Sequence, residues 1–242
     1  MAVVLVTGAS GRLGRKAVQV LAGTGHDVRA FSRGAGGDLR TGDGLDEAIE
    51  DARLVLHAAS DSHDRHGAGD IEGTRRLLAA SGEVEHLLYV SIVGVDRIPY
   101  RYYRNKLACE RLVAASGVPF TILRGTQFHE LAEGSLRHAE SRALASTVPL
   151  GFKVQLVAAQ EVAERLAGLL ATRPAHGVVE LGGPEVLTVG RVVETWRELR
   201  GPVRVVPLPL VGRVARAFRR GLNTTVRAEG RQTWREYVAS LD

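Results

Sequence analysis

Three glycines near the N-terminus constrain this chain most, because they lie between an apolar run and an amphipathic segment. Residues 3–7 form a short apolar run that is typical of a buried parallel strand. Residues 12–22 carry apolar side chains at helical spacing. Between them, Gly8, Gly11 and Gly14 follow a G-x-x-G-x-x-G spacing. The sequence therefore predicts a strand, a tight glycine-rich turn and a helix, in that order.

Each glycine has a separate physical reason to be there. The first lets the chain turn sharply out of the strand, the second lets backbone approach a pyrophosphate closely, and the third lets the helix pack against the sheet. The phosphates of a dinucleotide would then contact the free N–H groups at the helix N-terminus. The alternative is a glycine-rich turn that binds nothing. The residues expected at the cofactor are Gly8, Ala9, Ser10, Gly11, Arg12, Leu13 and Gly14.

Strands and helices alternate along the first half of the chain, which predicts an α/β fold with a doubly wound parallel sheet of the Rossmann type. We expect residues 1–242 to form a single domain. Its cofactor core would span about residues 1–125 and its substrate-facing elements about residues 126–242. The expected strands are 3–7, 27–31, 53–57, 86–90 and 120–123, and the expected helices are 12–22, 69–80 and 100–115.

The second half has a less regular rhythm. Thr188 is a candidate N-cap for one of its helices. An extended connection with three prolines, residues 201–210, precedes a short basic helix. The expected helices are 127–145, 161–171, 188–199 and 211–220, and the expected strands are 152–157 and 178–181.

The stretch after the second strand is unusually short. Only six residues separate Phe31 from Asp38, whereas a parallel crossover takes about a dozen residues or more. The third strand of the usual arrangement is therefore reduced to a stub or absent. We expect no regular helix between Arg33 and Thr41.

The end of the second strand indicates which dinucleotide is bound. An acidic residue near this position usually contacts the ribose hydroxyls of NAD, whereas an arginine accommodates the 2′-phosphate of NADP. Ser32 and Arg33 occupy it here, with Arg12 as a second candidate. These residues favour NADP(H) over NAD(H). The alternative is that Arg33 is one more solvated arginine.

Several further motifs make the chain resemble the atypical short-chain dehydrogenase/reductases of the NmrA-like, NAD(P)H-binding group. The resemblance implies that Asp38 and Leu39 border the adenine. It also implies that Ala58, Ala59 and Ser60 line the cofactor, and that Thr126, Gln127 and Phe128 border its nicotinamide end. The segments that carry the resemblance are 7–14, 37–39, 57–60, 70–74, 89–96, 102–106 and 123–128.

The same resemblance implies a catalytic set. Short-chain reductases use a Tyr-x-x-x-Lys pair on one helix, with a serine at the end of the preceding strand. Ser91, Tyr102 and Lys106 match this pattern. The spacing of i and i+4 puts tyrosine and lysine on one helix face, where the tyrosine exchanges the proton that accompanies hydride transfer. Tyr103 is a rival, and an ordinary amphipathic helix is the alternative reading.

Composition sets wider limits. A single cysteine, Cys109, excludes an internal disulfide, and no targeting or membrane-spanning segment is visible, so we expect a cytoplasmic protein. The net charge of +5 comes from scattered arginines, which favours solvated surface over a nucleic-acid site. One candidate metal loop consists of Asp61, His63, Asp64 and His66. One candidate docking face for an acidic partner consists of Arg213, Arg216, Arg219 and Arg220. For both clusters, the alternative is solvated surface.

These observations predict an NADP(H)-dependent oxidoreductase. It would transfer hydride to or from a carbonyl or an activated double bond of a small organic molecule. Two other functions fit the same motifs: a non-catalytic NADP(H)-binding redox sensor, and an isomerase or lyase. We expect a small-molecule substrate, no nucleic-acid or membrane partner, no metal, and a monomer or homodimer.

Overall fold

The computed structural model describes residues 2–61, 68–141 and 145–241. The chain divides into two compact units that are interleaved in the sequence. The first unit is Met1–Ser91, Arg101–Arg124 and Val162–Val179, and the second is Ile92–Tyr100, Gly125–Glu161 and Glu180–Asp242.

The first unit is built on a six-stranded sheet, as the alternation of strands and helices predicts. The strand order is β10-β5-β4-β3-β1-β2, and β2, β1, β3 and β4 pair in parallel along it. β1 is almost entirely buried, because strands in a parallel sheet are covered on both faces. The strands are β1 (Val3–Thr7), β2 (Asp27–Phe31), β3 (Ala52–His57), β4 (His86–Ile92), β5 (Phe120–Gly125) and β10 (Val178–Leu181).

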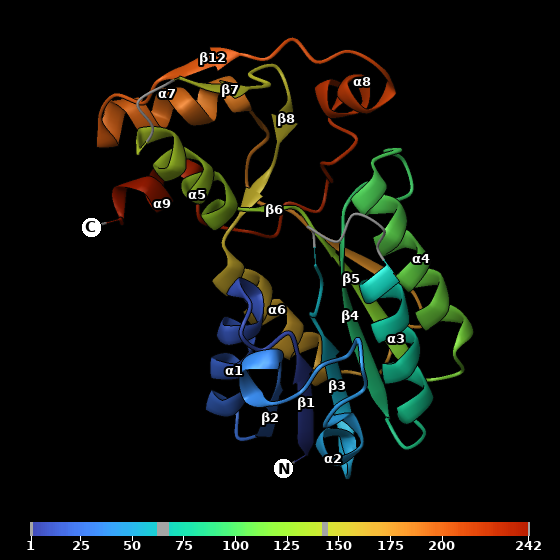
Figure 1. Cartoon of the computed structure of the whole chain (residues 1–242). Coiled ribbons are helices and arrows are strands. Elements are labelled where there is room, and N and C mark those ends of the chain that lie inside the picture. The colour runs from blue at the N-terminus through green and yellow to red at the C-terminus, as the bar shows by residue number, and fades with distance from the viewer. Residues whose placement is uncertain (1, 62–67, 142–144, 242) are drawn as a thin grey trace. The chain divides into compact units, whose positions relative to one another are not determined.

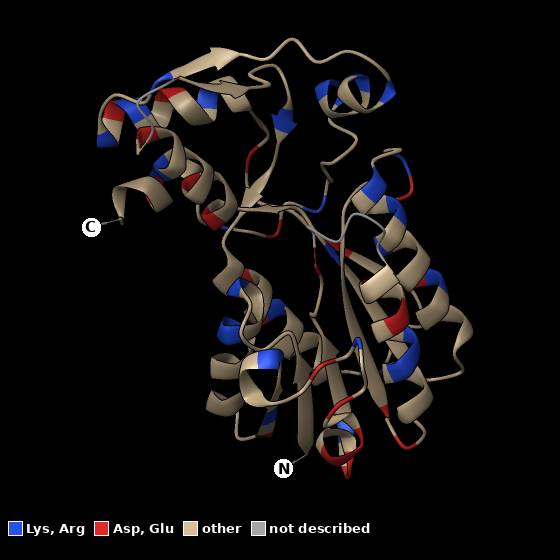
Figure 2. Ribbon diagram, viewed as in Figure 1, with Lys and Arg blue, Asp and Glu red and all other residues tan. Residues whose placement is uncertain are grey.

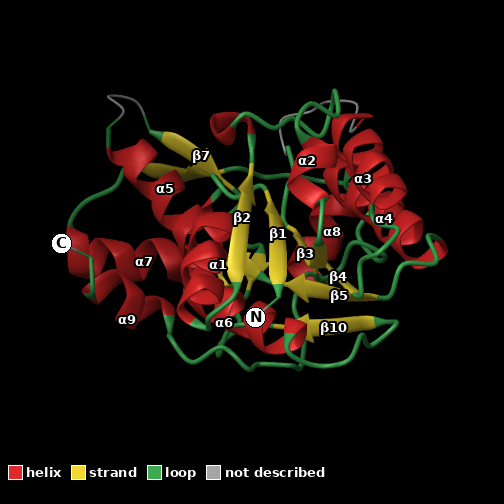
Figure 3. Ribbon diagram, turned by 90° about the horizontal axis from the view of Figure 1, so that it is seen from below, coloured by secondary structure: helices red, strands yellow, loops and turns green. Residues whose placement is uncertain are grey.

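Helices cover both faces of this sheet. α3 and α4 lie side by side on one face, and α1 and α6 lie on the other (Figure 1; Figure 3 gives a second view). The helices are α1 (Arg12–Gly23), the short α2 (Leu45–Ile49), α3 (Ala68–Ala80), α4 (Arg101–Ala115) and α6 (Ala159–Leu170). The fold is therefore the expected doubly wound α/β arrangement.

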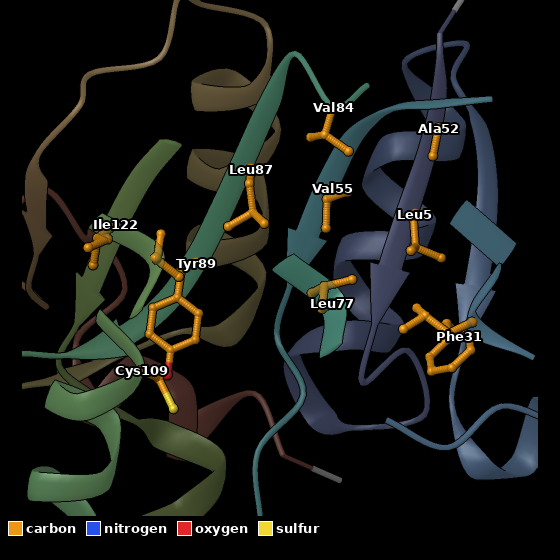
Figure 4. Packing of buried hydrophobic residues seen from close by; sticks show 12 residues of the cluster. Leu5, Phe31, Ala52, Val55, Leu77, Val84, Leu87, Tyr89, Cys109 and Ile122 are labelled. Atoms are coloured by element: carbon orange, nitrogen blue, oxygen red, sulfur yellow. The ribbon is translucent and has the colours of Figure 1, made fainter. Parts of the chain in front are cut away.

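One face of the sheet packs its core against α3 and α4. Leu5, Val55 and Leu87 from three neighbouring strands are fully buried there. Tyr89 points from β4 toward Cys109 on α4 (Figure 4). This packing anchors α4, the helix that carries Tyr102 and Lys106.

The short stretch after β2 contains no third strand of the sheet. It forms one 3-10 turn, η1 (Arg33–Ala35), and a single isolated bridge joins Asp38 to Asp43. β2 is consequently the last strand in the sheet order. The prediction of a reduced sheet, without a regular helix between Arg33 and Thr41, is confirmed.

The second unit differs from the sequence prediction in several elements. The helix expected from residue 127 begins at His129, because Gln127 and Phe128 form strand β6, which pairs with β9. The strand expected at 152–157 is divided into two short strands. The strand β12 and the final helix α9 were not predicted. The elements are β6 (Gln127–Phe128), α5 (His129–Glu140), β7 (Ser146–Val148), β8 (Lys153–Val154), β9 (Leu156–Val157), β11 (Leu187–Thr188), α7 (Val189–Arg200), β12 (Val205–Pro207), α8 (Arg213–Arg220) and α9 (Trp234–Ala239).

The second unit has its own aromatic core. The Trp234 ring stacks on His129, Trp196 and Tyr237, with ring centroids 5.7–6.1 Å apart. Thr188 caps α7 as predicted, accepting a hydrogen bond from the Arg191 amide. These contacts join α5, α7 and α9 into one packed body.

The contact between α1 and the turn before it leaves no room for a side chain at Gly14. A Cβ there would lie 2.1 Å from the carbonyl oxygen of Gly8. We expect Gly14→Ala to lower the free energy of unfolding by about 2–3 kcal/mol, as overpacking does, measured by urea denaturation.

Gly23 at the other end of α1 is the matched control, since a Cβ there meets nothing within 4 Å. Gly23→Ala should leave stability unchanged or raise it by up to about 0.5 kcal/mol. Equal effects of the two substitutions would contradict the packing argument.

Candidate functional site

A pocket of about 270 Å³ lies in the first unit, where β1, β2 and β3 end. Parallel α/β sheets bind ligands at this carboxyl edge. Four segments line the pocket: the glycine-rich turn, the stretch after β2, the end of β3 and the start of α3. The lining residues are Gly8, Ser10, Gly11, Phe31, Ser32, Arg33, Gly37, Asp38, Leu39, Arg40, His57, Ala58, Ala59, Ser60, Asp61, Gly69, Asp70 and Gly73.

The glycine-rich turn is held by backbone contacts. Gly8 has a φ of +70°, and a Cβ on it would lie 2.7 Å from the backbone of Ala59. The Gly11 amide donates to the Gly8 carbonyl at 2.9 Å, and Gly11 is the N-cap of α1. The N-terminus of α1 therefore opens at the pocket, as an anion site requires.

The other residues expected in this turn divide by position. Ala9 and Leu13 are buried and pack the turn onto the sheet. Ser10 lines the pocket. Arg12 is exposed and is not among the lining residues.

The wall after β2 brings together two sets of predicted residues. Ser32 and Arg33 were predicted to select the dinucleotide, and Asp38 and Leu39 to border its adenine. Ser32, Arg33, Asp38 and Leu39 all line the pocket. Asp38 Oδ1 accepts a hydrogen bond from the backbone amide two residues later, at 2.8 Å, which shapes the turn. The Arg33 side chain is exposed at the pocket.

Arg40 and Asp61 are pocket residues that sequence reasoning did not assign to the cofactor site. The Arg40 guanidinium and the Asp61 carboxylate form an ion pair of 2.6 Å. The two residues are 21 positions apart in the sequence and meet only in the folded chain. No local motif could therefore have indicated the pair.

His57, at the end of β3, belongs to segment 57–60 of the family resemblance, but the sequence analysis gave it no role. Its Nδ1 lies 2.7 Å from Thr7 Oγ1 and its Nε2 lies 3.0 Å from Thr74 Oγ1. The Thr74 hydroxyl donates to the Asp70 carbonyl, so His57 Nε2–H donates to Thr74 and Nδ1 accepts from Thr7. Burial, with the nearby Lys106 charge, lowers the His57 pKa from 6.5 to about 3. The ring is a neutral link between β1, β3 and α3.

Tyr102 contacts the pocket through Ser60. Its hydroxyl lies 3.0 Å from Ser60 Oγ, and Ser60 donates to Asp70 Oδ2 at 2.7 Å. Burial raises the Tyr102 pKa and the hydrogen bond with Ser60 lowers it, while the negative charge of Asp70 raises it. The neutral phenol is thus favoured in this structure.

Lys106 lies one turn further along α4 and is buried. Its Nζ lies 4.3 Å from the centre of the Tyr89 ring. Burial lowers the Lys106 pKa, and the charge of Asp70 opposes that shift. The ammonium group is therefore held against an aromatic face on the same side of the unit as Asp70.

Ser91 is engaged elsewhere. Its hydroxyl donates to Glu110 at 2.5 Å, and Glu110 also binds the Arg124 guanidinium at 2.7 and 2.9 Å. All three side chains are buried. The structure thus brings Tyr102 to Ser60 and places Ser91 in a separate ion-paired cluster. The catalytic role of Ser91, Tyr102 and Lys106 stays a prediction.

Thr126, Gln127 and Phe128 belong to the second unit, and their contacts are within it. Thr126 Oγ1 accepts from the Gly183 amide at 3.3 Å. The Gln127 carbonyl oxygen accepts from the Gln155 amide and from Asn223 Nδ2. Phe128 pairs with Val157 and is the N-cap of α5. Their expected position at the nicotinamide stays a prediction.

Two further clusters were candidates in the sequence: the possible metal loop and the arginines of α8. His63, Asp64 and His66 of the candidate metal loop lie outside the described residues. No group of three or more potential metal ligands occurs in the described part of the chain. The arginines of α8, coloured blue in Figure 2, are exposed, as a solvated face requires. None of the helices in the described ranges is long and apolar enough to span a bilayer.

Comparisons with known proteins identify a family and similar folds. A family model described as NAD(P)H-binding matches residues 8–172. No curated protein matches the chain.

Three solved structures share the fold, each below 25% identity. A short-chain dehydrogenase/reductase superfamily protein from Agrobacterium tumefaciens with bound NAD has 21% identity and a TM-score of 0.73, covering 98% of this chain and 94% of that one. The NADPH-dependent quinone oxidoreductase QOR2 from Escherichia coli, complexed with NADPH, has 18% identity and a TM-score of 0.74, covering 97% and 98%. A nucleoside-diphosphate-sugar epimerase from Staphylococcus aureus has 14% identity and a TM-score of 0.78, covering 99% and 100%.

The buried, neutral His57 makes stability depend on pH. Its folded-state pKa of about 3 lies below the ordinary 6.5, so the unfolded chain binds a proton that the folded chain refuses. Stability should fall as pH decreases from 6.5 toward 3, with His57 contributing up to about 1.4 kcal/mol per pH unit. In His57→Asn this slope should be smaller by that amount, measured by urea unfolding at several pH values.

The exposed His138 provides the control. His138→Gln should keep the slope of the parent protein. If His57→Asn keeps it too, His57 is not the group responsible.

Proposed function

This chain belongs to the NAD(P)H-binding family, and we propose that it is an NADP(H)-dependent oxidoreductase of the atypical short-chain type. It would transfer hydride to or from a carbonyl or an activated double bond of a small organic molecule. The observation that supports this proposal is the pocket of the first unit. One pocket is lined by the glycine-rich turn, by Ser32 and Arg33, by Asp38 and Leu39, and by residues 58–60.

The residues present fit a dinucleotide. Side chains are missing at Gly8, Gly11 and Gly14, where a Cβ would lie within 3.1 Å of the neighbouring backbone. The N–H groups that begin α1 would hold the pyrophosphate, and Asp38 with Leu39 would border the adenine. The nicotinamide would supply or accept the hydride. The carboxyl edge of the sheet is the place where this fold binds such ligands.

Arg33 supports NADP(H) over NAD(H). Its exposed guanidinium lies at the pocket, directly after β2. An arginine at this position suits a 2′-phosphate, because a charge-assisted hydrogen bond is stronger than a neutral one. The solved structures of similar fold include one with NAD and one with NADPH.

Tyr102 would be the proton donor and acceptor at the substrate oxygen. It is half-buried, with its hydroxyl at Ser60 on the pocket wall. The buried Lys106 ammonium would stabilise negative charge that develops on the phenol and would hold the ribose of the cofactor. The raised pKa of Tyr102 keeps the phenol protonated at neutral pH, as a proton donor requires. Cytoplasmic location, a small-molecule substrate and a monomeric or dimeric state stay predictions.

A redox sensor is the second candidate, and one observation favours it. Lys106 packs on Tyr89, and the Ser91 hydroxyl is given to Glu110. Lys106 and Ser91 are thus in contact with partners other than Tyr102. A sensor would bind NADP(H) through the same pocket and need no proton transfer.

Affinity should discriminate between the two dinucleotides. We expect NADPH to bind more tightly than NADH by about tenfold or more, since a charge-assisted contact contributes about 1.5–3 kcal/mol. Arg33→Ala should remove most of that preference while NADH affinity stays near the parent value. Calorimetric titration of the four combinations measures it.

Arg53 is the matched control, because it is an exposed arginine at the start of β3 that forms an ion pair with Glu85. Arg53→Ala removes the same charge away from the pocket and should preserve the preference. Equal affinities for both dinucleotides in the parent protein would refute the NADP assignment.

Tyr102→Phe should lower turnover by about 10²- to 10⁴-fold, the usual contribution of a positioned acid–base group. It keeps the ring and removes only the hydroxyl, so NADPH affinity should change little. The measurement is NADPH oxidation at 340 nm across a panel of carbonyl compounds and quinones, with binding measured in parallel.

Tyr103→Phe on the same helix serves as control and as rival, since Tyr103 is buried. Its turnover should stay near that of the parent protein. If Tyr103→Phe is inactive and Tyr102→Phe is active, the roles are reversed. If every variant binds NADPH and none of the panel is consumed, the sensor is the better description.

A further inference from the structure

A chain of hydrogen bonds leads from Tyr102 through Ser60 to Asp70. Tyr102 Oη lies 3.0 Å from Ser60 Oγ, and Ser60 Oγ donates to Asp70 Oδ2 at 2.7 Å. A serine hydroxyl has one proton. Since Ser60 donates it to Asp70, the Tyr102 hydroxyl is the donor toward Ser60.

Asp70 is the end of this chain. Its other carboxylate oxygen, Oδ1, accepts from the Asp61 amide at 2.8 Å, which fixes the direction of the carboxylate. Asp70 also lines the pocket and is only partly buried. The series therefore begins at a half-buried phenol and ends at a carboxylate that water reaches.

We propose that Ser60 and Asp70 form a proton relay between the Tyr102 hydroxyl and solvent. The proposal rests on the proposed function, in which Tyr102 exchanges a proton with the substrate. Ser60 and Asp70 would then serve the reaction through Tyr102, without contact with the substrate.

The proton transfer balances in both directions. In one direction, the Tyr102 O–H bond breaks and its proton goes to Ser60 Oγ, while the proton of Ser60 goes to Asp70 Oδ2. A phenol and a carboxylate thereby become a phenolate and a carboxylic acid, which loses its proton to water. In the reverse direction, water recharges Tyr102 after it has protonated a substrate oxygen. No electrons move in either step.

The two other groups expected to serve Tyr102 have different partners. Lys106 Nζ lies on the Tyr89 ring. The Ser91 hydroxyl donates to Glu110. Short-chain enzymes are expected to use such groups, and their engagement here leaves Ser60 as the hydrogen-bond partner that the structure shows for Tyr102.

The charges around Tyr102 define a test that needs no substrate. The acidic groups that face it are Asp70, Cys109 and Asp61, and each raises its pKa, whereas the hydrogen bond with Ser60 lowers it. Lys106 is the neighbouring cation on α4. Removing the Asp70 charge should thus lower the Tyr102 pKa, and removing the Ser60 hydroxyl should raise it.

The first experiment measures these shifts in the protein without cofactor. A difluorotyrosine at position 102 has a lower intrinsic pKa than tyrosine, which brings its titration into a measurable range, and its ¹⁹F signal reports the ionisation. Asp70→Asn should lower its pKa by about one unit or more, and Ser60→Ala should raise it. Asp38→Asn removes a carboxylate from the same pocket and should leave the signal unchanged. If Asp70→Asn shifts the titration no more than Asp38→Asn does, the relay is refuted.

The second experiment separates a relay from simple electrostatic coupling. With saturating NADPH and a substrate that the parent protein reduces, Ser60→Ala and Asp70→Asn should each lower kcat by about 10- to 100-fold. The double variant should be no slower than the slower single variant, since both remove one pathway. Added formate should restore part of the rate of Asp70→Gly, which leaves room for a small carboxylate, and none of the Tyr102→Phe rate.

Multiplicative losses, or no response to formate, would overturn the relay. Failure of the proposed function has a different signature: the parent protein then reduces no compound, while the ¹⁹F titration still decides whether Asp70 and Tyr102 are coupled. Opposite shifts in Ser60→Ala and Asp70→Asn support the relay, and absent shifts overturn it.

Discussion

The close backbone contact between the glycine-rich turn, the end of β3 and the first turn of α1 is the constraint on which the pocket depends. Gly8 lies against the backbone of Ala59, and Gly14 lies against Gly8. A side chain at either glycine would push β1, β3 and α1 apart, because those neighbours are main-chain atoms that have no rotamer to change. The N-terminus of α1 opens at the pocket only while these three elements are in contact.

Buried polar groups complete the arrangement. His57 connects Thr7 to Thr74, so the ends of β1 and β3 are fixed to α3 by neutral hydrogen bonds. The Glu110–Arg124 pair connects α4 to β5 in the interior. A buried ion pair carries a desolvation cost that offsets much of its attraction, so its contribution is better described as geometric. The same Glu110 carboxylate accepts the hydrogen bond of Ser91 in β4.

The parts of the fold that follow local rules could be predicted from the sequence. The glycine spacing predicted the turn, and the six residues before Asp38 predicted the missing strand, since chain length alone excludes it. Ser32 and Arg33 were predicted from their position at the end of β2, whereas Ala58, Ala59 and Ser60 were predicted from the family resemblance. The strands of the second unit were harder, because β6, β8, β9 and β11 have two residues each. Two residues show no periodicity.

The partners of the site residues were beyond the reach of sequence patterns. Ser60 and Tyr102 are 42 positions apart, and Ser91 and Glu110 are 19 apart. A motif reports which side chains share a helix face, but not which hydroxyl a neighbouring carboxylate attracts. The motif matched Ser91 to a catalytic position. In the structure α4 packs beside β4, and the Ser91 hydroxyl donates its hydrogen bond to Glu110.

The missing third strand also affects how molecules of this protein behave toward one another. β2 ends the sheet, and an unpaired strand offers backbone groups to which a strand of another chain can add. Arg29 reaches from β2 across to α2, where its guanidinium donates to the carbonyls of Glu47, Ala48 and Glu50. A long charged side chain on an edge strand is a recognised protection against strand addition. Substitution of Arg29 would therefore be expected to increase association between molecules before it disturbs the pocket.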